Sequence, residues 1–288
     1  MGGGSYSYLE SHTRSMSSYS TKSREQIFTK RHLDSEMNIK GKVRECCDTE
    51  EHPNTLPIII GLDVTGSMGH IPEDLIKHSF PEIMKNILDA GVTDPEVCFV
   101  GLGDFYFDDA PFQAGQFEAS DAAMEKWLMK TYLEGHGGGN MGESYNGAWY
   151  FALKHVKCDA IIKRHKKGVI ITIGDEPCLK EIPESNIINV YGDNTQGRYF
   201  SEDMLKALEP NWNVYHIHLG DSDTAKDDWY SYPGWQDLLG DNALYLSKSN
   251  YNIIKPIAEC VIKTFKENSG DVITVSNNTT STESEVIL

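Results

Sequence analysis

The feature that most restricts the fold is a repeated alternation of strand-sized apolar runs with segments of helical hydrophobic spacing. Four strands are expected, at Leu56 to Leu62, Val97 to Leu102, Gly168 to Ile173 and Trp212 to Leu219. In most of them apolar residues occupy consecutive positions, which is typical of strands that are buried on both faces of a sheet. The pattern therefore predicts a sheet that is covered on both sides.

Helical segments lie between and after these strands. Apolar residues recur three and four positions apart in Pro72 to Ala90 and again in Tyr251 to Lys266. Shorter elements complete the pattern: helices near Ala122 to Leu133 and Glu143 to Val156, a weak edge strand near Phe112 to Phe117, and a last strand at Ala243 to Leu246. Strands that alternate with helices predict an α/β fold, a doubly wound and mostly parallel sheet with helices on both faces.

The segments at the two ends differ from this central pattern. Residues 1–54 form an N-terminal arm, whose first twenty or so residues are rich in Gly, Ser and Tyr and lack regular periodicity. We expect this part to be flexible or to become ordered only against a partner, and a short helix to run from Ser23 toward Met37. Residues 55–268 hold the α/β domain, and residues 269–288 form a Ser/Thr-rich tail.

The chain is acidic, and its charge is unevenly distributed. It has 26 Lys and Arg against 43 Asp and Glu, a formal net charge of -17. Residues 1–45 contain eight Lys or Arg and five Asp or Glu, so this segment carries +3 and the remainder carries -20. An acidic body repels phosphate backbones and anionic lipids, so we expect neither nucleic acid nor a membrane as the partner.

Nothing in the sequence indicates export. The longest apolar runs are strand-sized, and the first residues, MGGGSY, show no basic region followed by an apolar one. The six cysteines include the adjacent pair Cys46 and Cys47, while others lie within apolar segments, which is unlike a disulfide framework. We therefore expect a cytoplasmic protein with reduced thiols.

Oxygen-bearing side chains follow the first of the buried strands. Asp63, Thr65 and Ser67 occupy alternate positions in the loop after Leu62, so they can converge on one point. A carboxylate with two hydroxyls is a hard, all-oxygen donor set that suits Mg²⁺ or Mn²⁺. Taken alone, the loop fits an ordinary turn equally well, with Ser67 as the N-cap of the next helix.

Two further loops carry candidate ligands. In the segment from Gly135 to Ser144, consecutive glycines precede Asn140 and Glu143, which can supply oxygens to a metal or cap the following helix. The third loop, after the strand that ends at Ile173, begins with Gly174 and Asp175. Because parallel strands end at the same edge of a sheet, we expect Asp175 to lie near the first loop.

Together these motifs resemble those of von Willebrand factor A domains. The sequence Asp63-x-Thr65-x-Ser67 after an apolar strand is similar to the family's Asp-x-Ser/Thr-x-Ser signature, which opens its metal-ion-dependent adhesion site. A glycine-rich loop and a strand that ends in the last metal aspartate follow in the family's order, at Gly137 to Gly142 and Val169 to Asp175. The resemblance covers roughly residues 55 to 268 and implies a Rossmann-like sheet with one antiparallel edge strand.

The resemblance also implies a site and a mode of action. Thr65 and Ser67 correspond to hydroxyl ligands, and Asp63 and Asp175 to carboxylates that reach the metal directly or through water. The family usually has Thr in the glycine-rich loop, and Asn140 is the first choice for that ligand here. The implied cofactor is Mg²⁺, with Mn²⁺ or Ca²⁺ as alternatives, and the implied partner is a protein that presents Asp or Glu to the metal. The chain would then act by binding and not as an enzyme.

Other classes of function fit parts of the sequence. A structural or assembly subunit would keep this fold and bind no metal, a possibility that the absence of the family's Thr leaves open. A serine hydrolase would use His136-Gly-Gly-Gly as an oxyanion loop and Ser144 as nucleophile, but that loop lies too close to the serine and the expected second glycine falls one residue late. A phosphatase of the aspartyl type would need an acid where Thr65 stands.

Overall fold

A six-stranded sheet lies at the centre of the computed structural model, which describes residues 3–135, 142–220, 234–247 and 251–270. The strands are β2 (Leu56–Asp63), β3 (Pro95–Leu102), β4 (Phe112–Ala114), β6 (Gly168–Gly174), β9 (Trp212–Leu219) and β10 (Ala243–Leu246). Their order is β10-β9-β6-β2-β3-β4, with all neighbours parallel except β4, which pairs antiparallel with β3 at the edge. This confirms the predicted doubly wound sheet with one antiparallel edge strand.

The central strands are apolar throughout because both of their faces are covered. All eight residues of β2 and all seven of β6 are buried. Successive side chains point to opposite faces, so Ile58 and Ile60 pack in one core while Ile59 packs in the other. The run of hydrophobic residues in the sequence is therefore continuous because alternate residues of each strand face the two cores.

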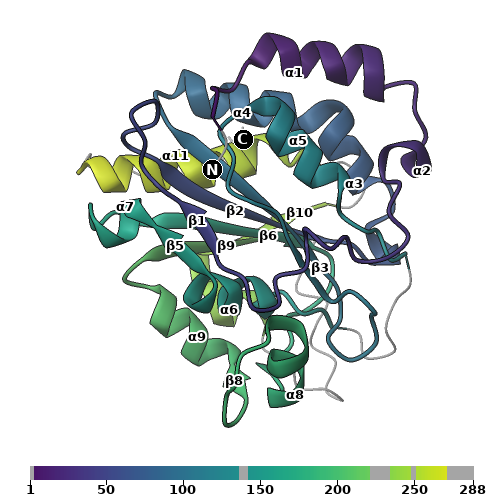
Figure 1. The fold of residues 1–288 in the computed structure, drawn as a ribbon, viewed down its shortest axis with the longest axis vertical. Coiled ribbons are helices and arrows are strands. Elements are labelled where there is room, and N and C mark those ends of the chain that lie inside the picture. Colours follow the sequence, from purple (N-terminus) through teal and green to yellow (C-terminus); the bar gives the residue numbers. More distant parts are fainter. Residues whose placement is uncertain (1–2, 136–141, 221–233, 248–250, 271–288) are drawn as a thin grey trace, which may run out of the picture.

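Helices cover the sheet on both sides (Figure 1). The first layer contains α1 (Tyr8–Arg14), the π-helical turn η1 (Ser15–Tyr19), α2 (Arg24–Ile27), α3 (Ile71–Asp74), the π-helical turn η3 (Leu75–Ser79), α4 (Phe80–Asp89), α5 (Asp121–Met129) and α11 (Ile254–Ser269). The second contains α6 (Asn146–Lys154), α8 (Glu184–Asn186), the π-helical turn η4 (Ile187–Tyr191), α9 (Ser201–Leu208) and α10 (Trp235–Leu239).

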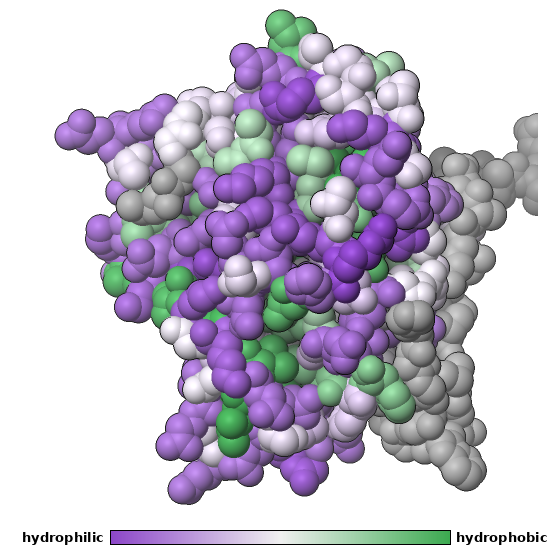
Figure 2. Space-filling view, turned by 45° about the vertical axis from the view of Figure 1, so that its right-hand side comes forward, coloured by the Kyte–Doolittle hydropathy of each residue, from purple (hydrophilic) through white to green (hydrophobic). Residues whose placement is uncertain are grey.

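The smaller elements sit at the margins of these layers. They are β1 (Arg44–Cys46), β5 (Val156–Cys158), α7 (Asp159–Ile162), β7 (Glu181–Ile182), β8 (Tyr199–Phe200), η2 (Gly66–Met68) and η5 (Gly240–Asn242). The face drawn in Figure 2 is mostly hydrophilic, with apolar residues in small separate groups. None of the helices that the structure describes is long and apolar enough to cross a membrane.

The N-terminal arm contains a helix that the sequence analysis missed. α1 and η1 form one continuous helical segment, where no helical periodicity was expected. The residues that it buries are Ser11, Ser15 and Tyr19, spaced four apart. The inward face is therefore helical in its spacing but mainly polar, and a search for hydrophobic periodicity cannot detect it.

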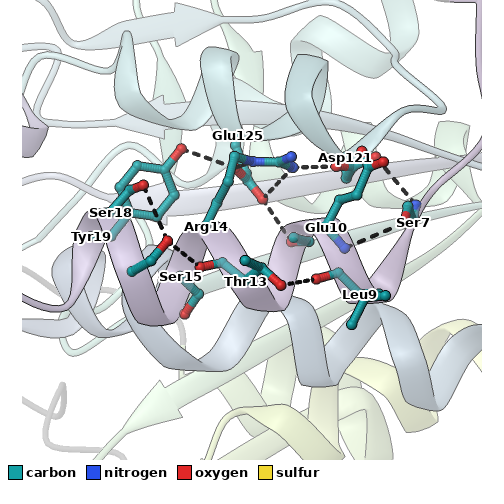
Figure 3. Close-up of polar contacts among 12 residues, drawn as sticks. Ser7, Leu9, Glu10, Thr13, Arg14, Ser15, Ser18, Tyr19, Asp121 and Glu125 are labelled. Atoms are coloured by element: carbon teal, nitrogen blue, oxygen red, sulfur yellow. Dashed lines mark hydrogen bonds and ion pairs between the residues drawn. The ribbon is translucent and has the colours of Figure 1, made fainter.

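Polar contacts attach this helix to α5 (Figure 3). The Arg14 guanidinium pairs with Asp121 and donates to a Glu125 carboxylate oxygen at 2.8 Å. Ser11 Oγ and Tyr19 OH also donate to Glu125, at 2.6 and 3.0 Å. The carboxylates lie one helical turn apart and are almost fully buried, so the arm supplies the hydrogen bonds that these acids lose to burial.

The rest of the arm also differs from expectation. The predicted helix from Ser23 toward Met37 is wrong beyond its first turn: a capping box formed with Gln26 starts α2, and Phe28 already leaves the helical conformation. Further along, β1 pairs in parallel with β5, and Ile39 and Cys46 enter the second core. The arm therefore packs as part of the α/β layers.

We predict that Arg14→Ala lowers the free energy of unfolding by about 2 to 3 kcal/mol, because two buried carboxylates lose their charged partner. Urea denaturation followed by circular dichroism measures the change. The control is Arg198→Ala, since Arg198 pairs with Glu181 at the surface and its removal should cost less than about 1 kcal/mol. Equal losses in the two variants would contradict the anchoring role of Arg14.

Candidate metal centre

The first predicted loop folds around the carboxylate that ends β2. Asp63 Oδ1 accepts hydrogen bonds from the Thr65 backbone N–H at 2.8 Å and from Thr65 Oγ1 at 2.6 Å. Thr65 Oγ1 lies 3.2 Å from Ser67 Oγ. Ser67 lies within the single turn η2 and caps no helix, which removes the simpler interpretation of this residue as an N-cap.

The third predicted loop meets the first, as the strand order requires. β2 and β6 are adjacent and parallel, and the chain crosses to opposite sides of the sheet from this pair, which is the switch point where doubly wound sheets bind ligands. Asp175 follows β6 directly, and its Oδ1 accepts a hydrogen bond from Ser67 Oγ at 2.7 Å. Four of the five predicted ligands therefore form one connected set of oxygens.

This set of oxygens is closed on the protein side and open toward solvent. Asp63 and Thr65 are fully buried and Asp175 is 6% exposed, whereas Ser67 lies at the surface. Gly66 is required at the turn because a Cβ there would lie 2.8 Å from the carbonyl oxygen of Gly135. That contact brings the beginning of the glycine-rich loop against the candidate centre. Asn140, the fifth predicted ligand, lies outside the described residues.

Glu143 occupies a different environment from the one expected. α6 begins only at Asn146, so Glu143 is not in its first turn. Its backbone is instead extended beside the third loop, where its N–H donates to the Pro177 carbonyl and its carbonyl accepts from the Leu179 N–H. Glu143 is 4% exposed, and its Oε2 has no hydrogen-bond partner among the described residues.

Tyr145 is a component of the centre that the sequence analysis did not identify. Its hydroxyl donates to Asp63 Oδ2 at 2.8 Å and accepts from the Glu176 N–H at 3.4 Å. A Cβ on Gly174 would lie 1.8 Å from this hydroxyl, so the glycine at the end of β6 makes room for the tyrosine. The only signal in the sequence is an aromatic residue directly after the glycine-rich loop.

Acidic groups are crowded around these oxygens. Burial, opposed by the hydrogen bonds from Thr65 and Tyr145, raises the pKa of Asp63 to about 7, and repulsion from Asp175 adds to the increase. Burial together with the negative charges of Asp63 and Asp104 raises the pKa of Glu143 to about 10. Without a cation, the protonated forms of Asp63 and Glu143 are therefore favoured, and a bound cation would favour their ionised forms.

The residues present fit a hard divalent cation. Oxygen ligands bind Mg²⁺ at about 2.1 Å in octahedral geometry, so neighbouring ligands lie about 3 Å apart. The oxygen–oxygen distances of 2.6 to 3.2 Å in this set are close to that spacing. No group of three or more His, Cys, Asp or Glu side chains suited to a metal occurs among the described residues, so a metal here depends on the two hydroxyls as well as the carboxylates.

Ser144, the candidate hydrolase nucleophile, has a structural role. It is fully buried, and its Oγ accepts a hydrogen bond from the Phe105 N–H at 2.8 Å. Its backbone N–H donates to the Gly103 carbonyl at 3.1 Å. Ser144 thus holds the chain that leaves β3, and its hydroxyl is not accessible to a substrate. His136, from the supposed oxyanion loop, lies outside the described residues.

No protein-family model and no curated protein sequence matches this chain. Similar solved structures include the pilus adhesin SpaC from Lactobacillus rhamnosus GG in an open conformation (13% identity, TM-score 0.47) and a von Willebrand factor type A from Catenulispora acidiphila (11%, 0.40). A third is proximal thread matrix protein 1 from the mussel byssus, with a zinc-occupied MIDAS motif (13%, 0.42). The matches cover 76%, 75% and 78% of this chain but only 31%, 43% and 46% of those chains.

We predict that the stability of metal-free protein falls as the pH rises from about 5 to about 7.5, partly through Asp63. Its native pKa of about 7 means that the folded state keeps a proton that the unfolded chain releases at about pH 4. The unfolded state then binds fewer protons, so stability decreases across this window. Asp63→Asn should reduce the decrease by on the order of 2 kcal/mol.

Urea denaturation in EDTA at several pH values measures this slope. Asp203→Asn is the matched control, because this carboxylate is exposed and should leave the slope of the wild type unchanged. If the stability of Asp63→Asn decreases with pH as steeply as that of the wild type, Asp63 is ionised in the native state over the whole pH range.

Proposed function

We propose that this chain is a binding module of the von Willebrand factor A type, in which Asp63, Thr65, Ser67 and Asp175 hold a divalent metal, preferably Mg²⁺. An Asp or Glu of a protein partner completes the coordination of that metal. The observation that carries the proposal is the connected set of four oxygens at the switch point of the sheet.

The charge of the set supports an electrophilic metal. Two carboxylates balance a divalent ion without excess negative charge, since Thr65 and Ser67 contribute neutral oxygens. The exposure of Ser67 leaves the outer side of the centre open to an incoming carboxylate. Tyr145 fixes the orientation of Asp63 from the inner side through the hydrogen bond from its hydroxyl.

We propose that the module acts without catalysis. The hydroxyl of the fully buried Ser144 accepts a hydrogen bond from a backbone N–H, which argues against a hydrolase that uses this serine. The acidic residues of the centre are hydrogen-bonded to hydroxyl groups, an arrangement that suits metal binding better than proton transfer to a substrate.

One observation favours a second candidate, a structural subunit that binds no metal. The hydroxyls of Thr65 and Ser67 already satisfy Asp63 and Asp175 by hydrogen bonds, so the loop is closed without a cation. In that case the loop is a structural link between β2 and β6, and the partner is held by other surfaces.

Calorimetric titration of EDTA-treated, dialysed protein with Mg²⁺ and Mn²⁺ distinguishes the two candidates. We predict saturable binding to the wild type and at least a tenfold weaker affinity, about 1.4 kcal/mol, for the double variant Ser67→Ala/Asp175→Ala. The metal should also raise the melting temperature of the wild type but not that of the double variant, because it binds only the native state of a protein with an intact site.

The control is Ser185→Ala/Asp203→Ala, which removes an exposed serine and an exposed aspartate away from the centre. It should bind metal like the wild type. If both double variants and the wild type give equal heats, the metal proposal is wrong and the structural subunit is favoured.

A further inference from the structure

A pocket of about 210 Å³ opens beside the candidate metal loop, where the N-terminal arm passes over the domain. The arm lines it with Arg24, Phe28, Lys30 and Arg31, and the opposite wall contains Leu133 and Gly135. We call this site the basic pocket. None of its lining residues supplies one of the four oxygens of the metal centre.

The basic pocket and the metal loop share a stretch of backbone. Arg24 Nη1 donates to the carbonyl oxygen of Gly69 at 2.6 Å, and Gly69 lies two residues beyond Ser67. On the other wall, Gly135 packs against Gly66, the residue before Ser67. The backbone on either side of Ser67 therefore borders the basic pocket.

The charge of the pocket is opposite to that of the chain. Its three cations face one lining carboxylate, Glu25, which accepts a hydrogen bond from Ser23 Oγ and whose pKa is lowered. Lys30 is paired with Asp34. Arg31 is exposed and makes no side-chain hydrogen bond or ion pair with the residues that the structure describes, so its guanidinium is available to a ligand.

The pocket is held in place from both directions along the chain. Upstream, the contacts of Arg14 with Asp121 and Glu125 anchor the arm (Figure 3). Within the pocket segment, Phe28 is almost fully buried in the first core. Downstream, the Met37 carbonyl accepts a hydrogen bond from the Ala114 N–H at 2.8 Å. The backbone that carries the three cations is therefore fixed, which lowers the ordering cost of binding a ligand.

We propose that the basic pocket binds an acidic polypeptide segment of the same partner whose carboxylate is bound by the metal. The inference rests on the proposed function and specifies its partner: the metal-binding Asp or Glu lies within a run of acidic residues. The chain outside residues 1–45 carries -20 and repels such a partner, and the cations of Arg24, Lys30 and Arg31 offset this repulsion at the point of contact.

The test uses a fluorescein-labelled octaglutamate peptide and measures its anisotropy with the full chain at low ionic strength in Mg²⁺. We expect saturable binding, which Arg31→Glu weakens by about five- to tenfold because one attraction becomes a repulsion. Lys40→Glu makes the same charge change at an exposed position of the arm outside the pocket, and should change the affinity by less than about twofold. About 0.5 M NaCl should abolish binding.

Three results would overturn the inference. Two of them are no binding of octaglutamate to the wild type and equal weakening by Arg31→Glu and Lys40→Glu. Binding of an octathymidylate that outcompetes octaglutamate would also overturn it, since the pocket would then select phosphates. Circular dichroism of Arg31→Glu excludes unfolding as the cause of a loss.

The Mg²⁺ titration described above is independent of this experiment, so the two proposals fail separately. Loss of Mg²⁺ binding with retained, Arg31-dependent binding of octaglutamate rejects the metal and keeps the pocket. Mg²⁺ binding without octaglutamate binding rejects the pocket and keeps the metal.

Discussion

The parallel pairing of β2 with β6 is the constraint on which the rest of the site depends. It places Asp63 and Asp175 at the ends of neighbouring strands, close enough for one hydroxyl, that of Ser67, to connect the first loop to the second carboxylate. The pairing is stabilised by the burial of both strands on both faces, which is worth far more than any hydrogen bond in the site. Burial of the apolar core therefore offsets the free-energy cost of bringing two acids together in a buried position.

Much of the fold was predictable because strands buried on both faces have a simple sequence signal. The same signal located Asp63 and Asp175, since strand ends in a parallel sheet share one edge. The helix α1 could not be found in this way, because its inward face consists of Ser11, Ser15 and Tyr19 and its partners are carboxylates. Tyr145 was missed for a related reason: its role follows from the space above Gly174, which exists only in three dimensions.

The two surfaces beside Ser67 have opposite electrostatic character. On the inner side, burial and the negative charges of neighbouring acids raise the pKa values of Asp63 and Glu143. On the outer side, the arm supplies cations to a chain with a large excess of acidic residues. The acids that suit a cation are buried, whereas the cations that suit an acidic partner are half-buried at Arg24 and Lys30 and exposed at Arg31. The role of Asn140 stays a prediction from the sequence.

The anchoring of the arm has a consequence for the order in which the chain is completed during synthesis. Arg14 and Glu125 are 111 residues apart, so the first helix emerges from the ribosome long before its partners exist. Its polar inward face needs no apolar surface to shield it during that interval. Docking closes a long loop and must follow the formation of α5, so α1 is made well before the helix that fixes it in place.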